Sequence, residues 1–155
     1  MKKVLIVLAL VALTIVPVAA KGVAGVGLEA GNPSGITFSY KIDNKWDGYA
    51  TVGFAFVNKA LDAVVGGQYK VTDFQIGKAS FDVNVGLQAG IFTDFKSFGI
   101  AARATGSVSY DWTWKNVGDF TAYLRLAGGV GIGVSGDYAK AGFSWAGALG
   151  LLYHL

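Results

Sequence analysis

Residues 80–92 have the sequence SFDVNVGLQAGIF, in which apolar residues alternate with polar or small ones over the whole length. The apolar series is Phe81, Val83, Val85, Leu87, Ala89 and Ile91. The other series is Asp82, Asn84, Gly86, Gln88 and Gly90. A period of two residues predicts a β-strand with one apolar face and one polar face.

Similar stretches fill the chain after residue 20 and predict about eight strands. The expected strands are 23–31, 36–43, 46–56, 61–75, 80–92, 98–112, 120–134 and 142–155. A change of phase near residues 71–74 predicts a β-bulge in the fourth strand. The NPSG sequence at 32–35 and the Gly77-Lys78 pair have the composition of tight turns.

Short connections join consecutive strands, so neighbouring strands are expected to be antiparallel. Such a meander leaves two exposed edges unless its first and last strands pair. The fold class predicted is therefore all-β: a closed antiparallel up-and-down transmembrane β-barrel of about eight strands.

Residues 1–20 have the features of a secretory signal peptide. Lys2 and Lys3 precede an apolar run from Val4 to Val16, and small residues lead up to a cleavage site after Ala20. An uncleaved membrane anchor is the alternative, but the apolar run is short for a span. The barrel domain is then expected to be 21–155.

The charge and cysteine content exclude several function classes. Removing Lys2 and Lys3 leaves 11 basic and 10 acidic side chains in 21–155, so no basic field for nucleic acid remains. The chain has no cysteine, which excludes disulfides and thiol chemistry. With one histidine and no cysteine, no metal-ligand spacing is present, and no cofactor is expected.

The apolar face of the predicted barrel is expected to point outward. Along residues 121–133 the other series is polar or small and ends in Gly129, Gly131 and Gly133, which suits a narrow interior. Charged residues make up only 15% of the chain, too few for the solvent face of a soluble barrel. Apolar faces of this size would form a very large patch if they faced water.

Tyrosine and tryptophan residues fall near one end of the predicted strands, as in the aromatic girdle of a membrane-spanning barrel. The residues assigned to this girdle are Tyr40, Trp46, Tyr69, Tyr110, Trp112, Trp114 and Tyr153. Together with the signal peptide, they predict an outer-membrane location, and these strand ends lie on the periplasmic side if the N-terminus is periplasmic.

In these features the chain resembles the small eight-stranded outer-membrane barrels, the class that includes the OmpA membrane domain and OmpX. The alternating C-terminus, Leu149, Leu151, Tyr153 and Leu155, is similar to the terminal strand that the barrel-assembly machinery reads, although that class usually ends in Phe or Trp. The segment GVGLEAGNPSGITFSYK also resembles the first hairpin of a group of small bacterial barrels. The resemblance implies a fold, a location, lipid contacts and this assembly partner, but no chemistry.

Two motifs with catalytic or cofactor associations have a structural interpretation here. Residues 131–136 match GxGxxG, but a dinucleotide loop needs a helix after it and a strand follows instead. His154 is interpreted as an interior residue at the rim rather than a catalytic base, because Ser144 lies far down the same strand. The chain is therefore predicted not to be an enzyme.

The interior face carries a set of charges that could either line a pore or fill it. The predicted interior charge cluster is Glu29, Lys70, Asp82, Arg103 and Arg125, with Asp62 nearer a rim. Because an unpaired buried charge is costly, we expect pairing, with Glu29 reaching Arg103 and Asp82 a candidate partner of Arg125. A plug of paired charges is favoured over a pore.

The expected outer turns, at 32–35, 57–61, 93–97 and 135–140, are all short, unlike the long loops of receptors and adhesins. The function predicted is a non-enzymatic integral outer-membrane barrel with a structural or envelope-organising role. A narrow channel for small solutes is the first alternative, and a lipid-modifying enzyme is the second.

Overall fold

The computed structural model describes residues 23–56 and 59–155, all of which belong to one antiparallel sheet or to its turns. The signal peptide expected at 1–20 lies outside the described residues. The strands are β1 (Val23–Asn32), β2 (Ser34–Lys41), β3 (Trp46–Ala55), β4 (Ala60–Ile76), β5 (Ala79–Thr93), β6 (Phe98–Trp114), β7 (Gly118–Ser135) and β8 (Tyr138–His154). In this part of the chain, no helix is long and apolar enough to cross a membrane.

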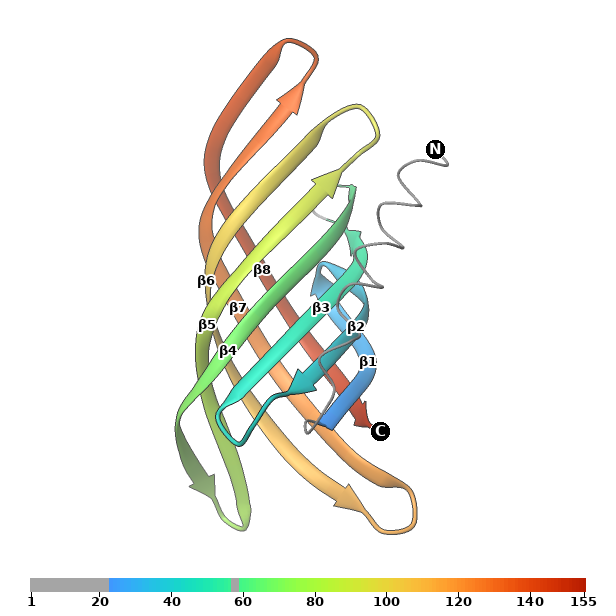
Figure 1. The fold of residues 1–155 in the computed structure, drawn as a ribbon, viewed down its shortest axis with the longest axis vertical. Coiled ribbons are helices and arrows are strands. Elements are labelled where there is room, and N and C mark those ends of the chain that lie inside the picture. Colours follow the sequence, from blue (N-terminus) through green and yellow to red (C-terminus); the bar gives the residue numbers. More distant parts are fainter. Residues whose placement is uncertain (1–22, 57–58) are drawn as a thin grey trace.

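The strands pair in sequence order, and β1 also pairs with β8, so the hydrogen bonds form a closed ring (Figure 1). This confirms the prediction of an all-β chain with eight antiparallel strands. We call the end of the ring that holds Val23 and His154 the terminal end, and the end with the β1–β2 and β7–β8 turns the distal end.

Local features predicted from the sequence are found in the ring. The register shifts between Lys70 and Thr72, which leaves Val71 as the bulge residue expected in β4. Gly77, with a φ of 63°, and Lys78 join β4 to β5 directly. Some strands are longer than expected. β6 and β7, for example, remain paired as far as Trp114 and Gly118.

The wall of the ring is uneven in height (Figure 1). β1, β2 and β3 have 10, 8 and 10 residues, whereas β4 to β8 have 15 to 18 residues each. The β7–β8 and β4–β5 hairpins therefore project beyond the low wall, at opposite ends.

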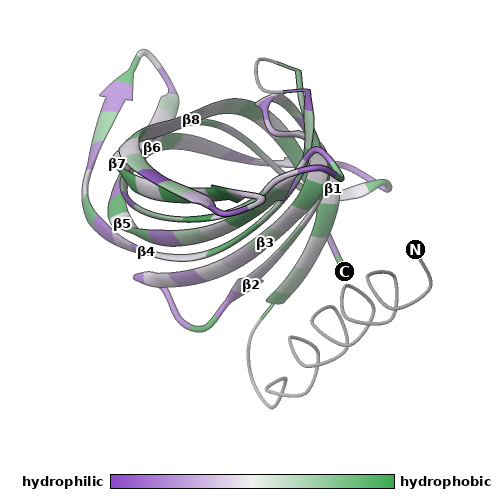
Figure 2. Cartoon of the chain, turned by 90° about the horizontal axis from the view of Figure 1, so that it is seen from above, coloured by the Kyte–Doolittle hydropathy of each residue, from purple (hydrophilic) through white to green (hydrophobic). Residues whose placement is uncertain are grey.

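Hydrophilic and hydrophobic residues alternate along the strands (Figure 2), and their side chains form an inner and an outer face of the ring. In β5, Val85 and Leu87 are 46% and 72% exposed on the outside, while Asn84 and Gln88 are 4% and 5% exposed on the inside. The interior is thus mainly polar, and most of the large apolar side chains lie on the outer face.

Candidate functional site

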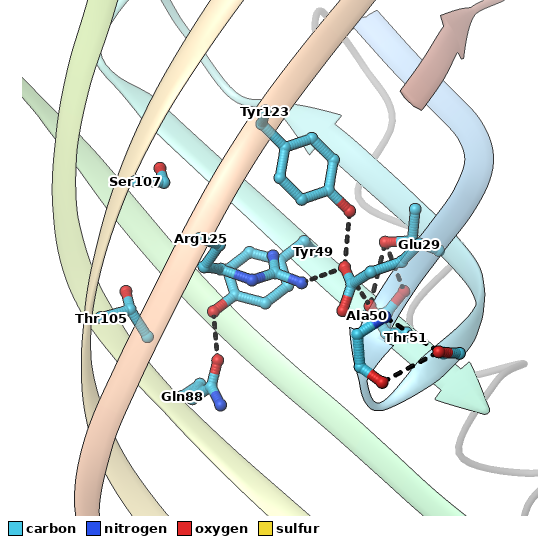
Figure 3. A network of polar contacts seen from close by, with 12 residues as sticks. Glu29, Tyr49, Ala50, Thr51, Gln88, Thr105, Ser107, Tyr123 and Arg125 are labelled. Atoms are coloured by element: carbon cyan, nitrogen blue, oxygen red, sulfur yellow. Dashed lines mark hydrogen bonds and ion pairs between the residues drawn. The ribbon is translucent and has the colours of Figure 1, made fainter. Parts of the chain in front are cut away.

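The centre of the interior is a hydrogen-bonded network around Glu29 of β1 (Figure 3). The Glu29 Oε2 atom accepts a bond from the Arg125 guanidinium on β7, one of 2.5 Å from the Tyr123 hydroxyl, and one of 3.3 Å from the Thr51 hydroxyl. A carboxylate buried this deeply needs such donors, because it has lost its water. The network ties β1 to β3 and β7.

Two tyrosine rings enclose Arg125 (Figure 3). The Arg125 Cζ atom lies 3.8 Å from the centre of the Tyr49 ring and 5.2 Å from that of the Tyr123 ring, both cation–π distances. The Tyr49 hydroxyl donates a bond of 2.8 Å to Gln88 Oε1 on β5. The side chains thereby bridge the interior from β7 through β3 to β5.

Glycines on neighbouring strands make room for these rings. Tyr49 pairs with Gly66 and Tyr123 pairs with Gly150 across the ladder. A Cβ atom on Gly66 would lie 2.5 Å from the Tyr49 ring, and one on Gly150 would lie 2.1 Å from the Tyr123 ring. The two tyrosines can lie across the interior wall only because these partners lack side chains.

A second polar group lies beside this network. Gln68 Nε2 donates to Thr105 Oγ1 at 3.1 Å, and Ser107 Oγ donates to Gln68 Oε1 at 3.0 Å. Asn84 Nδ2 donates to the hydroxyls of Ser107 and Ser109, each at 3.3 Å. Side-chain hydrogen bonds thus connect β4, β5 and β6 on the inner face.

The charge partners expected from the sequence are wrong. Glu29 bonds Arg125 rather than Arg103, and Asp82 bonds Lys70, at 2.6 Å, rather than Arg125. The physical reason is that neighbouring strands are offset along the axis of the ring. This offset brings Arg125 to the same level as Glu29, and it leaves Asp82 near the terminal end beside Lys70. All five residues of the predicted cluster lie on the inner face, but they form two separate groups and one unpaired guanidinium.

That guanidinium belongs to Arg103, which is 5% exposed in the distal half. Its Nε atom donates to Ser144 Oγ at 2.9 Å, while its Nη1 atom has no partner. Asp62 lies close enough to influence Arg103 electrostatically, but its own buried Oδ1 atom is also unpartnered. Ser144 is thus held by Arg103 and not by His154.

His154 belongs to a chain of contacts at the terminal end. Its ring is 9% exposed, and its Nε2 atom lies 2.6 Å from the Thr121 hydroxyl, which in turn donates to the carboxylate of Asp111. Asp111 also forms an ion pair of 2.6 Å with Lys41. Within the described ranges, no group of three or more His, Cys, Asp or Glu residues could hold a metal ion.

The inner face at the terminal end surrounds a small chamber of about 60 Å³ that is open to solvent. The charged side chains of its lining are those of Lys41, Asp47, Asp82, Asp111 and Arg125. The sequence interpretation did not single out Asp47, Asp111 or Lys41. They could have been found from the sequence, because the alternation places them at inward-facing positions close to strand ends.

On the outer face, aromatic rings follow one another around the terminal end. Trp46 and Tyr69 have ring centres 5.0 Å apart, and a longer series extends from β4 to β8 with neighbouring centres 5.3–5.7 Å apart. The members of the longer series are Phe74, Phe81, Tyr110, Trp112, Phe120 and Tyr153. Trp114 lies 6.4 Å from Phe120, and Tyr40 lies on β2. The three phenylalanines were missed because the prediction counted only tyrosine and tryptophan at this end.

Comparisons with known proteins find no matching family model, no matching curated protein and no matching solved structure. The functional argument therefore depends on the geometry of the two faces.

Proposed function

We propose that the chain is an integral outer-membrane β-barrel protein with a plugged interior and a structural or envelope-organising role, without enzymatic activity. The observation that carries the proposal is the inverted distribution of side chains between the two faces. Leu87, Leu126 and Phe143 are 72%, 62% and 80% exposed on the outside, whereas Glu29 and Arg103 are 4% and 5% exposed on the inside.

This distribution suits a hydrocarbon solvent better than water. Apolar patches that continue around a monomer are rare in water, because each square ångström of exposed apolar surface is costly. In lipid the same surface is favourable, and the closed ladder satisfies the backbone groups that lipid cannot. β1 and β3, with 10 residues each, have the length of about 9–11 residues that a tilted membrane-spanning strand needs.

The aromatic series supports placing the terminal end at one interface of the membrane. Rings that gather at one level of an apolar outer face are typical of the interface between hydrocarbon and headgroups. We place the terminal end, with Trp112 and Tyr153, at the periplasmic side and the distal turns outside. Outer-membrane lipid is then the main partner, and the barrel-assembly machinery is the partner during insertion.

The network around Glu29 supports a plug rather than an open channel. Arg125 and the two tyrosine rings occupy the middle of an interior that eight strands leave only just wide enough for side chains. A narrow channel is the second candidate, favoured by Gly133 and Gly142 in the distal half, where an added Cβ atom would meet nothing within 4 Å.

The proposal can be tested by folding the chain into detergent micelles and lipid vesicles. We expect the folded protein to migrate differently from the heated protein in electrophoresis, and to float with the vesicles through a density gradient after an alkaline wash. A chain that folds as a soluble monomer in detergent-free buffer and remains with the aqueous fraction would contradict it.

A further inference from the structure

A broad hollow lies on the outer face of the ring, where the two ends of the sequence meet. It has a volume of about 640 Å³, it is open on its outer side, and β1, β2, β7 and β8 all contribute to its lining. Its large side chains are those of Leu28, Ile36, Leu149 and Leu151, all of which are exposed. The outer hollow therefore spans the seam at which β1 pairs with β8 and the ring closes.

The outer hollow exists because small residues stand beside the large ones. Ala30 pairs with Leu149, and Ala122 pairs with Leu151, across the ladder. Directly opposite side chains on one face of a sheet are close enough to fill the space between them when both are large. Here one member of each pair ends at its Cβ atom, so an open space remains between the leucines.

The lining of the outer hollow offers no free polar side chain to a ligand. Glu29 is the only charged residue among the described residues of the lining, and its carboxylate lies on the inner face, where it bonds Arg125. The Ser34 hydroxyl bonds the carbonyl oxygen of Gly31. The backbone groups of these strands are used by the ladder. A ligand in the outer hollow is therefore held by apolar contacts.

The outer hollow begins just beyond the aromatic series of the terminal end. Leu151 lies two residues from Tyr153 on the same face of β8, which is roughly 7 Å along the strand. The Tyr153 ring belongs to that series, with its centre 5.3 Å from that of Phe120. In the membrane orientation proposed above, these rings lie at the level of the lipid headgroups. An acyl chain that starts at this level reaches the outer hollow directly.

We propose that the outer hollow holds one acyl chain of a diacyl phospholipid from the leaflet at the terminal end. This inference rests on the proposed membrane location. A second copy of the chain related by two-fold symmetry would place the hollow against itself and leave it unfilled, whereas a flexible acyl chain follows its shape. The bound chain contacts β1 and β2 on one side of the seam and β7 and β8 on the other, so it stabilises the closed ring.

Photolabelling of the folded protein in detergent micelles tests this proposal. The probe is a phosphatidylethanolamine with a diazirine in one acyl chain, added at increasing mole fraction, and mass spectrometry locates the labelled residues. We expect the label on Leu28 and Leu149 to saturate as the mole fraction rises. Leu87, on the opposite side of the ring, is the matched reference, because it is 72% exposed against 69% for Leu28. Its label should rise in proportion to the mole fraction. Proportional labelling at all three residues would overturn the proposal.

The site is tested by Ala30→Phe, which fills the outer hollow. We expect the saturable label on Leu149 to be lost in this variant. Ala89→Phe is the matched control, because Leu87 and Ala89 on β5 repeat the spacing of Leu28 and Ala30 on β1. This control should keep the saturable label of the wild type. Unchanged saturation in a folded Ala30→Phe protein would overturn the proposal.

The electrophoretic shift on heating distinguishes failure of the site from failure of the proposed function. A wild-type protein without the shift and without label at any residue would contradict both. A protein that shows the shift but takes up label only in proportion to the mole fraction would contradict the site alone. A dimer in sedimentation, with little label on Leu149 at any mole fraction, would mean that a second copy covers the outer hollow and would also overturn the proposal.

Discussion

The Arg125 guanidinium bonds the Glu29 carboxylate at the centre of the closed sheet, where their side chains are 7% and 1% exposed. The two residues are 96 positions apart in the chain and belong to β7 and β1, which are separated by β8. Their bond therefore fixes how the two ends of the sequence meet.

We expect Glu29 and Arg125 to be strongly coupled in a double-mutant cycle. Removing one partner leaves a buried charge unpaired, which costs about 3–5 kcal/mol, whereas removing both should cost clearly less than the sum. The cycle uses Glu29→Gln and Arg125→Met, measured by urea unfolding in detergent or lipid. The cycle for Glu29 and Arg103 is the control and should show little coupling. Equal coupling in the two cycles would contradict the observed pairing.

Replacing a glycine by alanine should destabilise the protein more where an aromatic ring lies over the glycine than where the space is open. Gly150→Ala places a Cβ atom 2.1 Å from the Tyr123 ring, so the ring must move away from Glu29. We expect a loss of about 1–3 kcal/mol in the free energy of unfolding, which is typical of overpacking. Gly133→Ala, where nothing lies within 4 Å, is the matched control and should be close to neutral. Similar stabilities of the two variants would mean that Tyr123 does not lie over Gly150.

The proposed lipid contact predicts that two neighbouring residues of β5 differ in their sensitivity to substitution when the protein is in vesicles. Val85 is 46% exposed on the outer face, so Val85→Arg should destabilise the protein in vesicles by about 2–4 kcal/mol if the residue is near the bilayer midplane. Asn84→Ser on the inner face should cost only about 1 kcal/mol, through its bonds to Ser107 and Ser109. The measurement is reversible unfolding from vesicles. Tolerance of Val85→Arg there would contradict an outer face in contact with lipid.

The proposed plugged interior predicts that the protein does not conduct ions steadily. We expect the purified protein to give no stable single-channel steps in planar bilayers at neutral pH, because the side chains of Arg125 and Tyr49 interrupt the water column. The Arg125→Ala variant removes the central side chain and should raise the frequency of open events. Asp137→Asn, in the β7–β8 turn, is the control and should conduct as the wild type does. Steady steps from the wild type would favour the channel interpretation.

The β5–β6 turn provides a prediction for pH dependence outside the strands. The carboxylate of Asp94 accepts bonds from the Ser97 hydroxyl at 2.8 Å and from the Ser97 and Lys96 amides at 2.6 and 2.9 Å. These bonds favour the ionised form and lower the pKa of Asp94, with the Ser97 hydroxyl as the main cause. The hydrogen bonds of the ionised Asp94 carboxylate therefore stabilise the turn fully above the ordinary pKa of an aspartate. This stabilisation is lost as the pH falls through the lowered pKa. In a carbon-detected NMR titration, Ser97→Ala should raise the pKa towards its ordinary value, and no change would contradict this assignment.

The sequence alone determined the local structure, because alternation, glycine and turn residues act over a few positions. The faces of β5, the bulge at Val71 and the turn at Gly77-Lys78 all follow from such short patterns. The closure of the sheet into a ring was also predicted from the sequence, since an open meander of this length would leave two unpaired edges.

Only the tertiary structure decided which interior residues meet. Alternation assigns Arg103 and Arg125 to the same inner face, but the stagger between strands sets their depth, and β1 meets β8 only once the ring closes. Glu29 therefore bonds Arg125, while Arg103 bonds Ser144. The ion pair of Lys41 with Asp111 has the same origin, because the Lys41 side chain reaches a strand that is distant in sequence and opposite in space.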